Sequence, residues 1–115
     1  PIVTDEIKIA VAGSGDIQLE LDANHSKAAI TGSGQIELSG TSKSFEAADA
    51  GSGDIEAYDL KTEKSELKNS GSGPIHASVE YELVARISGS GNVKYKGNPR
   101  VEDVKVSGSG NVSTY

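Results

Sequence analysis

The stretch Gly51-Ser52-Gly53-Asp54-Ile55 carries the pattern that decides the fold of this chain. Its Gly-Ser-Gly triplet occurs six times in 115 residues, and the recurrence is close to regular. The triplets are Gly13-Ser14-Gly15, Gly32-Ser33-Gly34, Gly51-Ser52-Gly53, Gly71-Ser72-Gly73, Gly89-Ser90-Gly91 and Gly108-Ser109-Gly110. Flexible Gly/Ser linkers keep no fixed period, so a repeat of about 19 residues predicts one structural corner in each unit of a stack.

Apolar residues alternate with polar ones on both sides of each triplet. Ile17 and Leu19 stand two and four residues after the first triplet, and Ile7, Ile9 and Val11 stand six, four and two residues before it. The later triplets keep the same offsets, and a period of two is typical of strands with one buried face. Each repeat therefore predicts two strands that meet at a Gly-Ser-Gly corner, with a polar return closing the circuit.

Strand, corner, strand and return predict one coil of a right-handed single-stranded parallel β-helix, an all-β β-solenoid of about six coils. Residues 1–115 are expected to form one domain. Equivalent residues stack in such a fold, so the corners should be narrow and should use the positive φ that glycine tolerates. The middle serines of the triplets are expected to stack as a hydrogen-bonded ladder of hydroxyls.

Composition excludes several classes of function. Seventeen acidic and eleven basic residues give a net charge of −6, which argues against nucleic acid because phosphate binding needs clustered Lys and Arg. Cysteine is absent, so disulfides, thiolate metal sites and thiol catalysis are excluded. No apolar run approaches the ~20 residues of a membrane helix. Residues 1–60 carry eleven acids and three lysines (−8), whereas residues 61–115 carry six acids and eight bases (+2).

Two columns of side chains after the triplets are expected to face outward. They are Gln18, Glu37, Glu56, His76, Lys94 and Ser113, and then Glu20, Ser39, Tyr58, Ser78, Lys96 and Tyr115. The candidate surface binding face within them consists of Glu37, Glu56, Tyr58, His76, Lys94 and Lys96. Glu37 and Glu56 should lie ~5 Å apart on adjacent coils, near the carboxylate separation of a retaining glycosidase. A solvated acidic face is the favoured interpretation, because stacked strands generate such pairs by default.

Asp49 and Asn69 fall in an inward column of otherwise apolar residues. A buried carboxylate needs a partner, so either the Asn69 amide and the serine ladder satisfy Asp49, or the wall opens there to water. A cation site is a less favoured alternative, because calcium takes six to eight oxygens and no dense acidic loop is present. No catalytic triad, cofactor motif or metal-ligand set is predicted, and His25 and His76 have no partner at a useful spacing.

The runs at residues 13–17, 51–55 and 87–99 resemble the bacterial family described as putative auto-transporter adhesin, head GIN domain. The resemblance extends from about Ile7 to Val112 and concerns the repeat-rich C-terminal part of that domain. It implies a β-helical, exported bacterial protein that is cell-surface, outer-membrane-associated or periplasmic. The family's leader and additional N-terminal β segment are not in these 115 residues, so we expect this domain to be part of a longer exported protein.

The favoured hypothesis is a non-enzymatic cell-surface or extracellular interaction module, an adhesin, whose partner is a glycan or a cell-surface protein. One alternative is a polysaccharide-active enzyme that uses Glu37 and Glu56, and another is a purely structural stalk. The first coil can be blunted by Pro1, Asp5 and Glu6, but the last coil has little protection at residues 112–115. Self-association through end coils is therefore expected, favoured by the oppositely charged halves.

Overall fold

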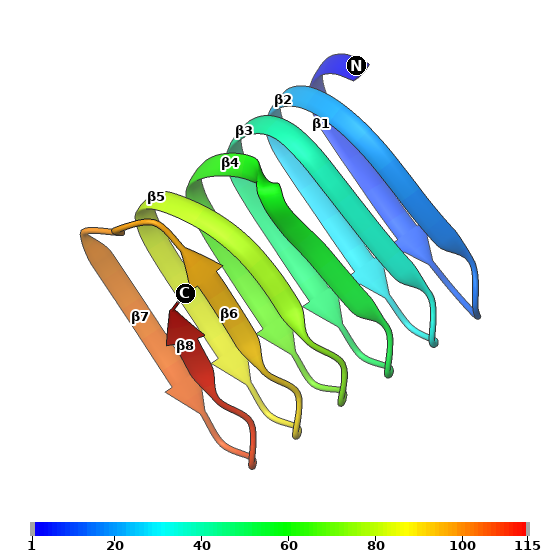
Figure 1. Cartoon of the computed structure of the whole chain (residues 1–115), viewed down its shortest axis with the longest axis vertical. Coiled ribbons are helices and arrows are strands. Elements are labelled where there is room, and N and C mark those ends of the chain that lie inside the picture. The colour runs from blue at the N-terminus through cyan, green and yellow to red at the C-terminus, as the bar shows by residue number, and fades with distance from the viewer. Residues whose placement is uncertain (1, 115) are drawn as a thin grey trace.

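The computed structural model describes residues 2–114, which form strands, turns and no helix. The strands are β1 (Ile2–Val11), β2 (Asp16–Ile30), β3 (Gln35–Asp49), β4 (Asp54–Asn69), β5 (Ile75–Ile87), β6 (Val93–Lys96), β7 (Val101–Val106) and β8 (Val112–Thr114). They stack in the order β1-β2-β3-β4-β5-β6-β8, with β7 also paired to β5, and every pairing is parallel. The predicted parallel β-solenoid of about six coils is confirmed (Figure 1).

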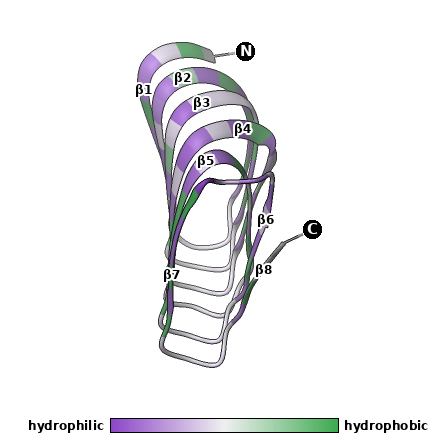
Figure 2. Ribbon diagram, turned by 90° about the vertical axis from the view of Figure 1, so that its left-hand side faces the viewer, coloured by the Kyte–Doolittle hydropathy of each residue, from purple (hydrophilic) through white to green (hydrophobic). Residues whose placement is uncertain are grey.

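Each of the long strands β2 to β5 forms most of one coil. It leaves a Gly-Ser-Gly turn along one wall, bends through an arch and returns along the opposite wall to the next turn (Figure 1). Figure 2 shows the coils overlapping in one narrow outline, with the arches, banded in purple, white and green, at one end and the pale glycine turns at the other. The sixth coil is interrupted at residues 97–100, so that β6 and β7 share its two walls.

The interior is filled by the alternating apolar residues that the sequence pattern predicts. Ile36, Ile55, Ile75 and Val93 stack on one wall and are all fully buried. Phe45, on the opposite wall, belongs to the same buried core. The alternating pattern therefore sets which face of each strand is inside, and the outward side chains are left on two flat walls.

The glycine corners are required for a different reason from the one predicted. Among the triplet glycines only Gly13 has a positive φ, and the other two such glycines, Gly40 and Gly97, lie outside the triplets. The expectation of positive φ at the other corner glycines, including Gly53, is therefore wrong. A Cβ added to Gly53 would overlap the Gly34 carbonyl oxygen of the preceding coil and would lie 2.8 Å from Ile30 Cγ2. Glycine is needed there because adjacent coils approach closely.

The expected ladder of serine hydroxyls is also absent among the described residues. The middle serines of all six triplets are exposed, and no hydrogen bond joins one hydroxyl to the next. The backbone connects the corners instead: the amide of Ser52 donates to the carbonyl of Gly32 at 3.1 Å, and the amide of Ser72 donates to Gly51 at 3.0 Å. Backbone amides are obligatory donors, so their bonds take the place of the predicted hydroxyl ladder.

The two unequal triplet spacings produce irregular pairing around β4. Glu37 pairs with Glu56, but Ser39 pairs with Asp59, so Tyr58 is an extra residue on β4. The predicted second outward column is therefore wrong at Tyr58. It is also wrong at Ser78, which is 8% exposed and hence buried.

The last coil exposes part of the interior. On β7, Val104 and Val106 occupy inward positions but are each 42% exposed, because no further coil covers them. The lumen is partly closed by Tyr95, whose hydroxyl donates to Glu102 Oε1 at 2.6 Å across the two walls. Among the described residues there is no helix long and apolar enough to cross a membrane.

Candidate functional site

We call the wall that follows each Gly-Ser-Gly turn the post-triplet face, defined by the outward residues at the starts of β2 to β5 and in β6 and β8. The strand register aligns one outward column there: Gln18, Glu37, Glu56, His76, Lys94 and Ser113. Lys96 lies beside Ser78 in the next column, and Tyr115 lies outside the described residues. The structure thus brings five of the six candidate binding residues onto paired strand positions, and Tyr58 lies on the bulge beside them.

Glu37 and Glu56 are half-buried neighbours on this face. Burial raises the pKa of Glu56, and a hydrogen bond and charge repulsion from Glu37 raise it further, with Asp54 adding to the effect. These residues contribute to a shallow depression of about 200 Å³ that is also lined by Ser39 and Tyr58. A retaining glycosidase needs its two carboxyls ~5 Å apart with the sugar between them. The depression is smaller than the ~300 Å³ of the smallest typical ligand pockets, so it encloses a sugar ring poorly.

An aromatic pair lies at the middle of the same face. The rings of Tyr58 and His76 meet edge to face, with centroids 4.6 Å apart and an interplanar angle of 78°. Burial lowers the pKa of His76, and the nearby positive charge of Lys94 lowers it further, while Asp54 acts in the opposite direction. The lowered pKa favours the neutral form of the His76 ring. The aromatic pair lies between the acidic and the basic region of the face.

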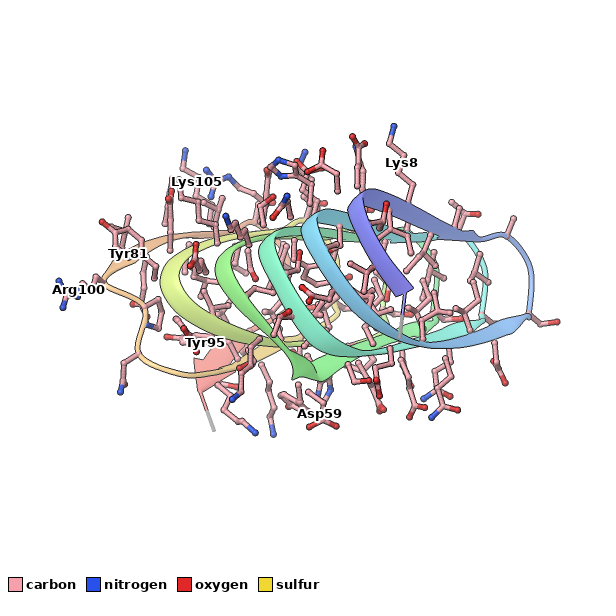
Figure 3. The ribbon with its side chains drawn as sticks, turned by 90° about the horizontal axis from the view of Figure 1, so that it is seen from above. Lys8, Asp59, Tyr81, Tyr95, Arg100 and Lys105 are labelled. Atoms are coloured by element: carbon pink, nitrogen blue, oxygen red, sulfur yellow. The ribbon has the colours of Figure 1, made fainter. Side chains whose placement is uncertain are left out.

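Charge on the post-triplet face is separated along the solenoid. Acidic side chains occupy the coils of β2 to β4, and lysines occupy the coil of β6. The acids are Asp16, Glu20, Glu37, Asp54, Glu56 and Asp59, and the lysines are Lys94 and Lys96. In Figure 3, Asp59 projects from the opposite side of the solenoid to Lys8 and Lys105.

The opposite wall, the pre-triplet face, is defined by the outward residues of β1, of the ends of β2 to β5, and of β7. Most of its charged side chains form ion pairs with each other. The five ion pairs between described residues all lie there: Lys8–Glu6, Lys27–Glu46, Lys64–Glu82, Lys68–Glu66 and Arg86–Asp103, with N to O distances of 3.0 to 4.0 Å. The Arg86 guanidinium also holds the pKa of Asp103 below its ordinary value.

The inward polar residues differ from both predicted arrangements. Asp49 and Asn69 are each 1% exposed, so the wall does not open to water. Asp49 Oδ1 accepts a hydrogen bond from the amide of Gly51 at 3.2 Å, whereas the Asn69 side-chain amide donates to the carbonyl of Gly73 at 2.7 Å. The prediction that Asn69 and the serine ladder satisfy Asp49 is therefore wrong.

Sequence reasoning also missed the polar pairs inside the arches. Thr62 and Ser65 are buried with their hydroxyl oxygens 2.6 Å apart, and Thr62 also donates to the carbonyl of Ser78. The inward position of Ser65 is visible in the repeat, but its partner lies in the return segment, which has no fixed register in the sequence. Within residues 2–114 no group of three or more His, Asp or Glu side chains could hold a metal ion.

Two solved structures share this architecture. A putative adhesin from Bacteroides fragilis matches with a TM-score of 0.95 and 27% identity, over 98% of this chain and 52% of that one. A putative lipid binding protein from Parabacteroides distasonis matches with a TM-score of 0.81 and 27% identity, over 99% of this chain and 56% of that one. The chain thus spans about half the length of these relatives.

No protein of curated function matches the chain. A family model, described as putative auto-transporter adhesin, head GIN domain, matches residues 1–99. This match covers most of the repeats and all of the post-triplet face up to β6, and it confirms the resemblance drawn from the corner motifs. The chain therefore belongs to the putative auto-transporter adhesin, head GIN domain family.

Proposed function

We propose that this chain is a non-enzymatic interaction module of an exported bacterial protein, and that it binds a glycan or a cell-surface protein through its post-triplet face. The observation that carries the proposal is the difference between the two walls. Both walls are flat, charged and built on the same strands, yet the ion pairs of the described residues gather on the pre-triplet face. Charges arranged to satisfy each other have little left to offer a partner.

The post-triplet face has the features of a recognition surface. Its acids and lysines are separated along the stack, so a partner with a complementary distribution of charge would be oriented on it. Tyr58 and His76 add aromatic surface at its centre, and aromatic residues are enriched where proteins bind partners. The same wall supports an enzyme less well, because the depression beside Glu37 and Glu56 is about 200 Å³, below the size of typical ligand pockets.

The test compares two double variants with the same change in charge. Glu37→Gln with Glu56→Gln alters the post-triplet face, and Glu46→Gln with Glu66→Gln is the matched control on the pre-triplet face. We expect the purified parent to bind ligands on a glycan array or in a panel of purified cell-surface proteins. The first variant should lose at least tenfold in affinity, and the control should keep the parent affinity. Equal losses in both variants would contradict the assignment of the face.

The catalytic alternative has its own measurement. Release of reducing ends from a panel of polysaccharides by the parent, abolished by the Glu37→Gln and Glu56→Gln double variant, would replace the binding proposal with an enzymatic one. The stalk alternative predicts assembly without any ligand. Location at the bacterial cell surface or in the periplasm, within a longer exported chain, is part of the proposal and is tested by fractionating cells that express the native gene.

Self-association through the end coils is a further part of the proposal. Among the described residues, the outer edges of β7 and β8 have no partner strand, and Val104 and Val106 are each 42% exposed. The −8 charge of residues 1–60 and the +2 charge of residues 61–115 favour head-to-tail contact. Sedimentation at several concentrations should show association that weakens with added salt. A monomer at all concentrations up to the millimolar range would refute it.

A further inference from the structure

Asp49, the last residue of β3, has a buried carboxyl oxygen with no hydrogen-bond partner. The residue is 1% exposed, and its Oδ1 accepts from the amide of Gly51 at 3.2 Å. Its Oδ2 is buried and receives no donor. A carboxylate oxygen left in this position is costly, because it has lost water without gaining a hydrogen bond. The folded chain therefore favours a form of Asp49 that does not need a second donor.

The next coil shows which hydrogen bonds this position offers. Asn69 pairs directly with Asp49 in the strand register and occupies the same place before its own corner. Its Oδ1 accepts from the amide of Gly71 at 3.2 Å, as Asp49 does from Gly51. Its Nδ2 donates to the carbonyl of Gly73 at 2.7 Å. The position thus accepts one hydrogen bond from the residue two places on and donates one to the carbonyl four places on.

The carbonyl four places after Asp49 belongs to Gly53, and its expected backbone donor is missing. One row of hydrogen bonds climbs the corners, from the amide of Gln35 to Gly15 and from the amide of Asp54 to Gly34, both at 3.2 Å. The next residue in this row is Pro74, which has no N–H. The Gly53 carbonyl is therefore left with an open acceptor position, and Asp49 Oδ2 lies in the same turn.

We propose that in mildly acidic solution Asp49 is a neutral carboxylic acid in the folded protein and donates its Oδ2 proton to the carbonyl of Gly53. The protonated side chain then stabilises the corner through this hydrogen bond. Protonation satisfies both the buried oxygen and the open carbonyl, in the same manner as the Asn69 amide one coil on. Ionisation of Asp49 removes the donor and leaves two acceptors facing each other, so the corner and its coil become less stable as pH rises.

The electrostatic surroundings agree with this geometry. Ile30 of β2 and Asn69 of β4 flank Asp49 in the inward column, and neither is charged. The charged group that acts on it among the described residues is Asp54 at the start of β4. Burial, opposed by the Gly51 hydrogen bond and assisted by Asp54, raises the pKa of Asp49 from 3.8 to about 6. Lys68 and Arg86 belong to the outward columns of the same wall, away from the lumen.

The sign of the pH effect follows from linkage. A carboxyl with a higher pKa in the folded state than in the unfolded state contributes its full stabilisation below pH ~4. That stabilisation is lost as pH rises through the folded pKa of about 6. The parent should therefore lose at least a factor of ten in its folding equilibrium constant between pH 4 and pH 8 from this residue alone.

The experiment combines Asp49→Asn with the reciprocal Asn69→Asp. In thermal unfolding, Asp49→Asn should have the same melting temperature as the parent at pH 4 and a higher melting temperature than the parent at pH 8. Asn69→Asp should melt below the parent at pH 8, because a second corner then depends on a proton. NMR titration of the Asp49 carboxyl carbon in the folded parent is the direct measurement. An inflection near pH 6 supports the proposal. An inflection near pH 4, or a lower melting temperature for Asp49→Asn at pH 8, would overturn it.

Discussion

Replacing Gly53 by alanine tests the reason for the glycine corners. The φ of Gly53 is not positive, so alanine introduces no backbone strain of that kind. Its Cβ would overlap the Gly34 carbonyl oxygen and approach Ile30 Cγ2 to 2.8 Å, and both neighbours belong to the coil below. The matched control is Gly15→Ala, at the same triplet position in the first coil. Gly15 also lacks positive φ, and nothing lies within 4 Å of its added Cβ.

The magnitude can be worked from the hydrogen bonds that the overlap would disturb. The coils can relieve the overlap by separating at the corner, which lengthens the bonds from Ser52 and Gly53 to Gly32 and from Asp54 to Gly34, at 3.1, 3.1 and 3.2 Å. At about 1 kcal/mol each, their loss costs about 3 kcal/mol. Alanine returns about 0.5 kcal/mol by restricting the unfolded chain. Gly53→Ala should therefore lower the free energy of unfolding by about 2 to 3 kcal/mol.

Urea denaturation and thermal unfolding measure this difference. A loss of about 2.5 kcal/mol corresponds to a fall of roughly 10 °C in Tm for a domain of this size. Gly15→Ala should change the free energy of unfolding by less than about 1 kcal/mol, in the stabilising direction. Gly53→Val should be worse than Gly53→Ala, because its branches reach further into the coil below. If Gly53→Ala and Gly15→Ala melt within a degree or two of each other, close approach of the coils is not what the glycine provides.

Two further predictions concern polar side chains. Changing Glu37 and Glu56 together to Gln should alter the free energy of unfolding by no more than about 0.5 kcal/mol, and a loss above about 2 kcal/mol would make this pair structural. Because the pKa of Glu56 is raised in the folded chain, its ionisation lowers the stability of the parent as pH rises. In urea denaturation, the stability of the variant relative to the parent should therefore be higher at pH 8 than at pH 4. Tyr95→Phe removes the hydroxyl that donates to Glu102, and should cost about 1 to 3 kcal/mol in urea denaturation. The same contact raises the pKa of Tyr95 to about 12. In a spectrophotometric titration of the tyrosines, the ionisation seen at the highest pH in the parent should therefore be missing from the variant.

The fold was predictable because a solenoid repeats the same sequence pattern in every coil. A regular recurrence of Gly-Ser-Gly, with alternation on both sides of each triplet, leaves few structures other than stacked coils. The inward and outward residues follow from the same alternation, and the structure places Ile36, Ile55 and Ile75 in one buried column accordingly. A weak signal in one repeat becomes decisive when five others agree with it.

Local departures from the repeat were predictable in existence but not in place. The long step from Gly51 to Gly71 and the short step from Gly71 to Gly89 indicate an insertion and a deletion, but the sequence does not say where the chain accommodates them. The structure puts the extra residue at Tyr58, where Ser39 pairs with Asp59. Counting from the triplet therefore gives the correct neighbours for Glu56 but not for Tyr58. Distance along the chain from a fixed corner determines how far such counting holds.

Side-chain partners at the corners were the least predictable feature. The sequence shows that Asp49 and Asn69 share an inward column, and the simplest expectation is that they bind each other. Each instead turns to the backbone of its own corner, because an amide two residues on is closer and better fixed than a side chain one coil away. Local hydrogen bonds from Asp and Asn to nearby backbone amides are common for this reason.

The separation of charge on the post-triplet face is significant because most charges on the pre-triplet face are paired. A parallel in-register stack places residues of equivalent position beside one another, so like charges accumulate in columns unless the repeats differ. Like charges also lie in register on the pre-triplet face, with Glu46 beside Glu66 and Lys68 beside Arg86. Ion pairs offset them there, as where Lys27 of one coil lies 3.3 Å from Glu46 of the next. On the post-triplet face Glu37 lies beside Glu56. Burial is the main cause of the raised pKa of Glu56, and repulsion from Glu37 adds to it. The two walls thus differ in whether ion pairs between described residues offset the like charges that the register brings together. Binding of an oppositely charged partner would relieve that repulsion, which is why the post-triplet face, rather than its neutralised counterpart, is the surface to probe with ligands.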